Sequence, residues 1–176
     1  RFAIFDNYHV PTGGIGHADI AVSTQLTLDR LARLHRLATM WRGPISASIF
    51  LCSSTEVAML DAALESSPLL KRYVAMQVVV GHSEYLPINM LRNVAAQNAE
   101  SMADWLVVLD VDNLPSHSMP VVRQQVKRAA RAWEAHVQAG GKMFVTLAVK
   151  NLFGIVVGMR KGLAHMKNGV SHEKFA

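Results

Sequence analysis

Four short apolar segments alternate with three segments whose apolar residues recur at helical spacing, and this order constrains the fold more than any other feature. The apolar segments are short and rich in β-branched residues, as strands are. The intervening segments place apolar side chains three and four residues apart, as amphipathic helices do. A strand–helix alternation predicts an α/β fold with a mostly parallel sheet flanked by helices. The predicted strands are 18–26, 44–52, 73–81 and 104–112, and the predicted helices are 27–41, 53–67 and 87–101.

Local signals set the expected boundaries of these elements. Gly43-Pro44 ends the first helix, and Ser53 with Glu56 three residues later forms a capping box for the second. Pro87 lies near the start of the third helix, where its missing N–H is tolerated. We expect four divisions: an irregular entry at 1–18, a nucleotide-sugar-binding half-domain at 19–120, an amphipathic helix at 121–141 and a basic tail at 142–176.

The charge distribution is uneven along the chain. Residues 1–120 hold 8 Lys or Arg and 11 Asp or Glu, whereas residues 121–176 hold 10 and 2. The basic end raises the option of a nucleic-acid partner, but no aromatic residues interleave with the basic ones, so we do not expect nucleic acid to bind. The basic residues of 121–141 are expected to form a solvated face rather than a binding patch.

The single cysteine and the apolar runs exclude several protein classes. Cys52, alone in the chain, excludes an intrachain disulfide and a cysteine-based zinc cluster, and its apolar neighbours predict that it packs in the core. No apolar run approaches the ~18 residues of a membrane span. Because the chain opens on Arg1 rather than Met, we expect any membrane anchor to lie upstream of it.

The last predicted strand ends on two acids. Asp110 and Asp112 follow five consecutive apolar residues, at the carboxyl end of a strand, where ligands gather in parallel sheets. Two carboxylates in that position suit Mg²⁺ or Mn²⁺, which keep open coordination positions for phosphate oxygens of a substrate. An acidic turn that caps its own backbone is the alternative reading of such a pair. The strand and helix order around the pair favours the metal site.

Several motifs in this order resemble glycosyltransferase family 49, which includes the glucuronyltransferase domain of LARGE-type enzymes and a β-1,4-glucuronyltransferase. The resemblance covers residues about 19–120, and residues about 142–176 depart from it. The motifs are Gln25 with Asp29-Arg30, Trp41-x-Gly43-Pro44-Ile45-Ser46, Pro87-Ile88-Asn89-x-Leu91-Arg92-Asn93 and Asp110-x-Asp112-x-x-Pro115.

This resemblance implies part of a GT-A-like, Rossmann-like domain that extends a glycan. It implies a UDP-sugar donor, UDP-glucuronic acid or a related compound, and a glycan or glycoprotein acceptor. It also implies Mn²⁺, or Mg²⁺, on Asp110 and Asp112, and a place in the Golgi lumen as part of a type II membrane protein. The alternative is an inactive or partial nucleotide-sugar-binding module that lacks the acceptor half, and the sequence does not decide whether the chain is an enzyme.

Four further residues are candidates for donor contacts. Arg92 and Asn89 lie three apart on the third helix, and a guanidinium suits a diphosphate or a carboxylate. A structural ion pair with an acid such as Asp110 is an equal alternative for Arg92. Thr24 and Gln25, after the first strand, are candidates for uridine contacts, with helix capping as their alternative.

The sequence nominates no catalytic residue. Inversion, which the resemblance suggests, needs a carboxylate base, but Glu134 and Glu173 are the only acids after Asp112 and neither lies in a supporting motif. His165 and His172 come late enough to be a third metal ligand, yet their surroundings favour ordinary surface histidines.

Overall fold

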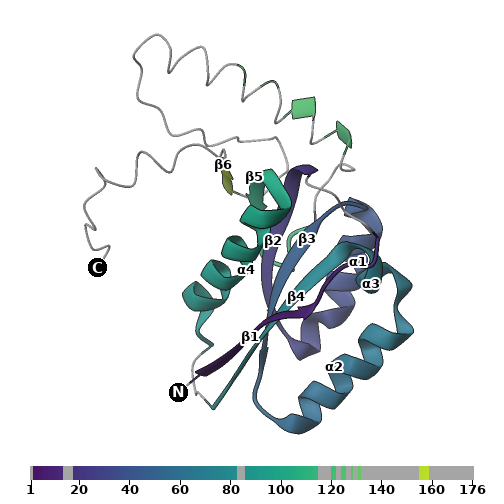
Figure 1. Cartoon of the computed structure of the whole chain (residues 1–176), viewed down its shortest axis with the longest axis vertical. Coiled ribbons are helices and arrows are strands. Elements are labelled where there is room, and N and C mark those ends of the chain that lie inside the picture. The colour runs from purple at the N-terminus through teal and green to yellow at the C-terminus, as the bar shows by residue number, and fades with distance from the viewer. Residues whose placement is uncertain are drawn as a thin grey trace, which may run out of the picture.

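The computed structural model describes residues 2–13, 18–82, 86–114, 120, 121, 124, 125, 128, 131 and 155–158. These residues contain a six-stranded sheet in the order β1-β4-β3-β2-β5-β6, drawn in Figure 1. β2, β3, β4 and β5 run parallel, and β1 and β6 pair antiparallel at the two edges. The predicted α/β fold with a mostly parallel sheet is therefore confirmed. The strands are β1 Phe2–His9, β2 Ala18–Thr27, β3 Ile45–Leu51, β4 Val74–Gly81, β5 Ala103–Val108 and β6 Ile155–Gly158.

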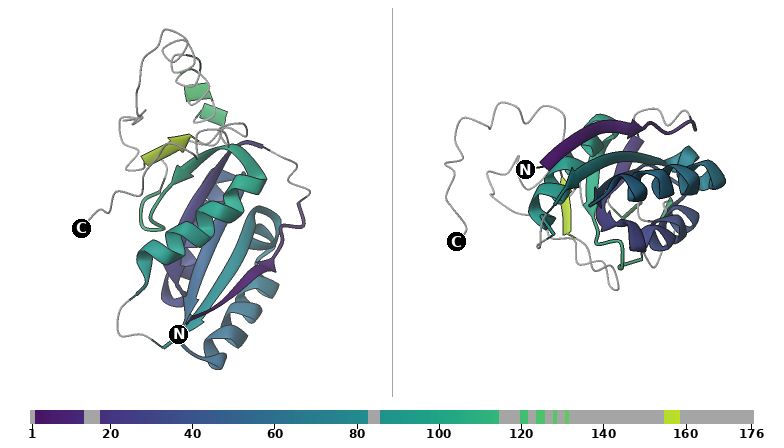
Figure 2. Two further views of the ribbon diagram at one scale, coloured as in Figure 1. Left: turned by 60° about the vertical axis from the view of Figure 1, so that its left-hand side comes forward. Right: turned by 90° about the horizontal axis from the view of Figure 1, so that it is seen from below.

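Helices cover both faces of this sheet, and Figure 2 shows the resulting layers from two further directions. Three helices and a short 3₁₀ turn lie on one face, and a single long helix lies on the other within the described residues. Each pair of parallel strands that follow one another in the chain is thus joined by at least one helix packed on the sheet, as in a βαβ unit. The elements are η1 Leu28–Arg30, α1 Leu31–Trp41, α2 Ser54–Ser66, α3 Pro68–Tyr73 and α4 Ile88–Met102.

The main apolar core lies between the sheet and α1, α2 and α3. Leu34, Leu37 and Trp41 of α1 are fully buried there. The indole Nε1 of Trp41 donates to the backbone oxygen of Pro44 at 3.1 Å, which fixes the turn between α1 and β3. Arg42 in that turn has φ 49°, the left-handed conformation that commonly ends helices.

The face beneath α4 is polar at its centre. The Ser48 hydroxyl donates to the backbone oxygen of Leu91 at 2.6 Å, and the Ser46 hydroxyl donates to that of Ala95 at 2.8 Å. Gln77, fully buried, lies beside Ser46 with its Oε1 atom 3.2 Å from the hydroxyl. Side-chain hydrogen bonds therefore fix the position of α4 along β3.

Two local expectations are wrong. Residues 1–18 are not wholly irregular, because β1 pairs with β4, more than 60 residues later in the chain. Cys52 is exposed rather than in the core, because β3 ends at Leu51 and the chain turns there toward α2.

Other boundaries are confirmed or shifted. The N-cap half of the capping box is confirmed, since Ser53 Oγ accepts from the Glu56 backbone N–H at 3.2 Å. The Glu56 carboxylate accepts from the backbone N–H of Cys52, one residue before the N-cap, and not from that of Ser53. The short helix α3 was not predicted, although Ser67 caps it and Pro68 occupies its first turn. β5 ends at Val108, so Asp110 lies beyond the strand, in the turn that follows.

Most of the chain's basic end lies outside the described residues. Of the helix predicted at 121–141, the structure describes residues 121, 124, 125, 128 and 131, and all are helical. The remaining residues of that helix, together with His165, His172 and most of the basic tail, are not described. No helix among the described residues has the length and apolar character needed to cross a membrane.

Candidate functional site

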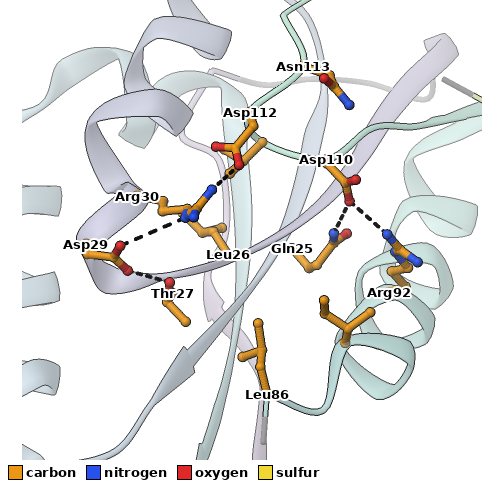
Figure 3. A pocket seen from close by; sticks show the side chains of 12 residues that line it. Gln25, Leu26, Thr27, Asp29, Arg30, Leu86, Arg92, Asp110, Asp112 and Asn113 are labelled. Atoms are coloured by element: carbon orange, nitrogen blue, oxygen red, sulfur yellow. Dashed lines mark hydrogen bonds and ion pairs between the residues drawn. The ribbon is translucent and has the colours of Figure 1, made fainter. Parts of the chain in front are cut away.

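A cleft of about 450 Å³ opens at the carboxyl end of the parallel strands, between the segments that follow β2 and β5 and the start of α4. Figure 3 shows its side chains from close by. In parallel sheets, ligands bind at the carboxyl ends of the strands, because the connections that follow neighbouring strands diverge there. The lining residues are Gln25, Leu26, Thr27, Asp29, Arg30, Leu86, Ile88, Arg92, Asp110, Val111, Asp112 and Asn113.

Asp110 lies between β2 and α4 and contacts both. Its Oδ1 atom accepts hydrogen bonds from Gln25 Nε2 and, at 2.9 Å, from a terminal nitrogen of Arg92. The hydrogen bond from Arg92 lowers the pKa of the Asp110 carboxyl below its ordinary value; partial burial opposes this and Gln25 reinforces it. Asp110 is therefore an anion, as a metal ligand must be. The sequence allowed Arg92 either a contact with the donor or a structural ion pair with Asp110, and in this structure the ion pair is formed.

Asp112 faces the opposite side of the cleft, toward α1. The guanidinium of Arg30 contacts its Oδ2 atom, and a terminal nitrogen of Arg33 lies 2.8 Å from its Oδ1 atom. Arg30 also lies 3.9 Å from Asp29, whose carboxylate accepts a hydrogen bond from the Thr27 hydroxyl. Both acids at the end of β5 are thus paired with arginines that come from different helices.

Gln25 is the buried polar residue of the cleft, with only 7% of its surface exposed. Its amide nitrogen binds Asp110, while its Oε1 atom is buried with no hydrogen-bond partner among the described residues. A buried acceptor without a partner carries a desolvation cost that a ligand can remove. Gln25 therefore holds one unpaired hydrogen-bond acceptor just behind the surface of the cleft, which a ligand reaches when a neighbouring side chain moves.

The other two candidates for nucleoside contacts do not line the cleft. Thr24 is buried in β2, on the same face as Leu26 but two residues farther from the end of the strand, and of these two only Leu26 reaches the cleft. Asn89 is exposed in the first turn of α4. The structure thus brings Gln25, Arg92, Asp110 and Asp112 together and leaves Thr24 and Asn89 outside the group.

The donor set suits a hard divalent cation only in part. Carboxylate oxygens of Asp110 and Asp112 and the side-chain amide of Asn113 are ligands that Mg²⁺ and Mn²⁺ accept, with phosphate oxygens completing the shell. Among the described residues, however, no three His, Cys, Asp or Glu side chains are arranged so that they could hold one metal ion. A cation here depends on the two acids and on a ligand that brings oxygens of its own.

Sequence reasoning missed Arg33 and the apolar wall of the cleft. Arg30 and Arg33 lie three residues apart and so reach the same carboxylate, a spacing visible in the sequence. Leu86 and Ile88 are each 39% exposed and form an apolar wall beside Arg92. No local pattern marks these two, because their exposure depends on how α4 meets the sheet.

Known proteins match a little over half of this chain. It is 35% identical over 103 residues to the xylosyl- and glucuronyltransferase LARGE2 of Rattus norvegicus, and 30% identical over 102 residues to LARGE1 of Homo sapiens. It is 32% identical over 100 residues to the glycosyltransferase-like protein gnt15 of Dictyostelium discoideum. The matched segment is related to the LARGE-type glycosyltransferases. The resemblance drawn from the motifs is thereby confirmed.

The matches cover more than half of this chain but only a small part of each relative. Each match spans 57% of this chain but only 19% of the Dictyostelium protein, 14% of rat LARGE2 and 13% of human LARGE1. The match therefore spans less than a fifth of the length of each of these three relatives. No protein-family model matches the chain.

Proposed function

We propose that this chain supplies the donor-binding half of a glycosyltransferase that takes a UDP-sugar, UDP-glucuronic acid or a related compound, together with Mn²⁺ or Mg²⁺. The observation that carries the proposal is the cleft at the carboxyl edge of the sheet. There Gln25, Arg92, Asp110 and Asp112 converge within a segment related to LARGE-type enzymes. The acceptor, by the same relation, is a glycan or glycoprotein.

Each of these side chains has a distinct task in the proposal. Asp110 and Asp112 hold the cation, whose positive charge offsets the charge that develops on the diphosphate leaving group. The Arg92 guanidinium forms paired hydrogen bonds to an anionic group of the donor. Gln25 Oε1 accepts a hydrogen bond from the nucleoside, and Leu86 and Ile88 exclude water from one side of the donor.

The reaction follows from what such a donor can lose. The bond between the anomeric carbon and the diphosphate oxygen breaks, the nucleoside diphosphate departs, and an acceptor hydroxyl forms the new bond. The proton of that hydroxyl passes to a general base. We assign the base to none of the described residues and place it in the acceptor half of the enzyme.

Calorimetric titration of UDP into the full chain, with and without Mn²⁺, tests the proposal. We expect Mn²⁺ to tighten UDP binding, and we expect Asp112→Ala to remove this dependence on the metal. The matched control is Glu100→Ala, which removes an exposed acid from α4 outside the cleft. UDP binding that is indifferent to Mn²⁺ in the unmodified chain would refute the metal-dependent donor site.

Turnover separates the enzyme from a binding module. Incubation with UDP-glucuronic acid and Mn²⁺, followed by measurement of released UDP, detects donor hydrolysis or transfer. Tight, metal-dependent UDP binding without any release supports a binding module, whereas release that Asp112→Ala abolishes supports the transferase. By resemblance to LARGE-type proteins, we also propose that the parent protein acts in the Golgi lumen.

A further inference from the structure

Among the described residues, the acids and the arginines at the cleft are equal in number before any ligand enters it. Asp29, Asp110 and Asp112 line the cleft together with Arg30 and Arg92, and Arg33 reaches Asp112 from just outside the lining. Asp112 is the centre of this arrangement, because two guanidinium groups share its single carboxylate. Arg30 contacts one oxygen of Asp112 and Arg33 the other, so a cation that takes both oxygens displaces both arginines and sets them free for another anion.

We propose that Arg30 and Arg33 form the phosphate-binding site of this cleft, and that a divalent cation and a diphosphate enter together by exchanging the partners of Asp112. The inference rests on the proposed function and deepens it, because it assigns the diphosphate to residues other than Arg92. In the ligand-free chain Asp112 occupies these guanidinium groups. In the loaded cleft the cation takes Asp112, and the phosphate oxygens take the arginines.

The geometry of the two arginines suits this exchange. They lie three apart, in η1 and the first turn of α1, so both reach the same point. Their side chains are 41% and 57% exposed, so neither is fixed by packing. Exposed ion pairs contribute little to stability, so breaking them costs little. Guanidinium groups bind phosphate oxygens through paired hydrogen bonds, as they bind carboxylates.

The charge balance predicts that the two ligands bind cooperatively. A cation alone would take Asp112 and leave Arg30 and Arg33 beside it as unpaired positive charges. A diphosphate alone would take the arginines and leave Asp112 as an unpaired negative charge next to it. When both bind, every charge has a partner, so each ligand raises the affinity for the other by the same factor.

Titrations of the full chain with Mn²⁺ alone and with inorganic pyrophosphate at zero and saturating Mn²⁺ measure this factor. The concentrations are corrected for the Mn²⁺–pyrophosphate complex that forms in solution. In the unmodified chain we expect Mn²⁺ to raise pyrophosphate affinity about tenfold or more. In Arg33→Ala we expect Mn²⁺ alone to bind more tightly, because Asp112 then has one competing arginine instead of two. We expect pyrophosphate to bind more weakly, with much of the coupling lost.

Arg36→Ala is the matched control, since it removes an exposed arginine from the same helix outside the cleft. Arg33→Lys keeps the positive charge but cannot form paired hydrogen bonds, so we expect its coupling to lie between that of Arg33→Ala and that of Arg36→Ala. Circular dichroism verifies that each variant is folded. The inference is overturned if Arg33→Ala matches Arg36→Ala in coupling, or if it weakens the binding of Mn²⁺ alone.

A parallel titration with UDP separates this inference from the proposed function. Coupled binding of Mn²⁺ and pyrophosphate, lost in Arg33→Ala, with no preference for UDP, supports the arginine site and refutes the nucleotide site. Metal-dependent UDP binding that Arg33→Ala leaves intact supports the nucleotide site and refutes the arginine assignment.

Discussion

The polar contact beneath α4 makes a sharp prediction about Ser46. The Ser46 hydroxyl has one proton and donates it to the backbone oxygen of Ala95 at 2.8 Å. Because that proton is already used, Gln77 can bind Ser46 Oγ only as a donor. Exchanging the oxygen and nitrogen of the Gln77 amide, which are assigned from the hydrogen-bond network, places Nε2 at the position 3.2 Å from Ser46 Oγ and gives this nitrogen a partner. The result is a chain of hydrogen bonds from Gln77 through Ser46 to α4.

Ser46→Ala should therefore leave the fully buried Gln77 amide without this partner. Leaving a buried polar group unpaired costs about 1–3 kcal/mol. At about 2 kcal/mol, the melting temperature of a chain this size falls by about 4–8 °C. Ser48→Ala, which leaves no side chain unpaired, should lower the free energy of unfolding by only about 1 kcal/mol.

Urea denaturation followed by circular dichroism measures both values. The double variant Ser46→Ala/Gln77→Met replaces both partners with apolar groups, so it should be more stable than Ser46→Ala alone. A Ser46→Ala variant within about 0.5 kcal/mol of the unmodified chain, the range of an ordinary surface change, would refute the reasoning. So would a double variant whose loss equals the sum of two single losses.

Two further predictions concern the periphery of the fold. Burial and the hydrogen bond to Asp61 raise the pKa of Tyr8 from its ordinary value of 10.0 to about 12. The protonated phenol therefore stabilises the fold fully below about pH 10, and this stabilisation is lost as the pH rises through about 12. In Asp61→Asn, ultraviolet titration should show Tyr8 ionising closer to pH 10, with Tyr8→Phe assigning the signal; an unchanged pKa would contradict this. Ser53→Ala removes the N-cap of α2 and should lower the free energy of unfolding by about 1 kcal/mol in urea denaturation, whereas Ser54→Ala, inside the helix, should not.

The order of strands and helices was predictable because each element has a strong period of its own. β3 is buried along its whole length and α1 carries a clear apolar stripe, so neither depends on distant residues for its type. β1 was missed because it is an exposed edge strand, paired with β4 far along the chain. The sequence of residues 2–9 contains no sign of that partner.

The candidate site was predictable to the level of residues but not of contacts. Asp110, Asp112 and Gln25 could be named because each lies at or just beyond the carboxyl end of a parallel strand, and these ends meet on the same side of the sheet. Their partners could not be named, since pairing Asp112 with both Arg30 and Arg33 depends on the angle at which α1 crosses the end of the sheet. Thr24 shows the same limit, because one position along β2 separates a buried side chain from one that lines the cleft.

The bonds that define the cleft join parts of the chain that are far apart in sequence. Gln25 and Asp110 are separated by 85 positions, and Arg30 and Asp112 by 82. Neither bond can form until β5 has paired with β2, a non-local step that is slow in folding because it closes a long loop. The rate at which a refolding chain gains ligand binding would therefore report the rate at which β5 pairs with β2. A nascent chain that still lacks β5 has no cleft in which a ligand can bind.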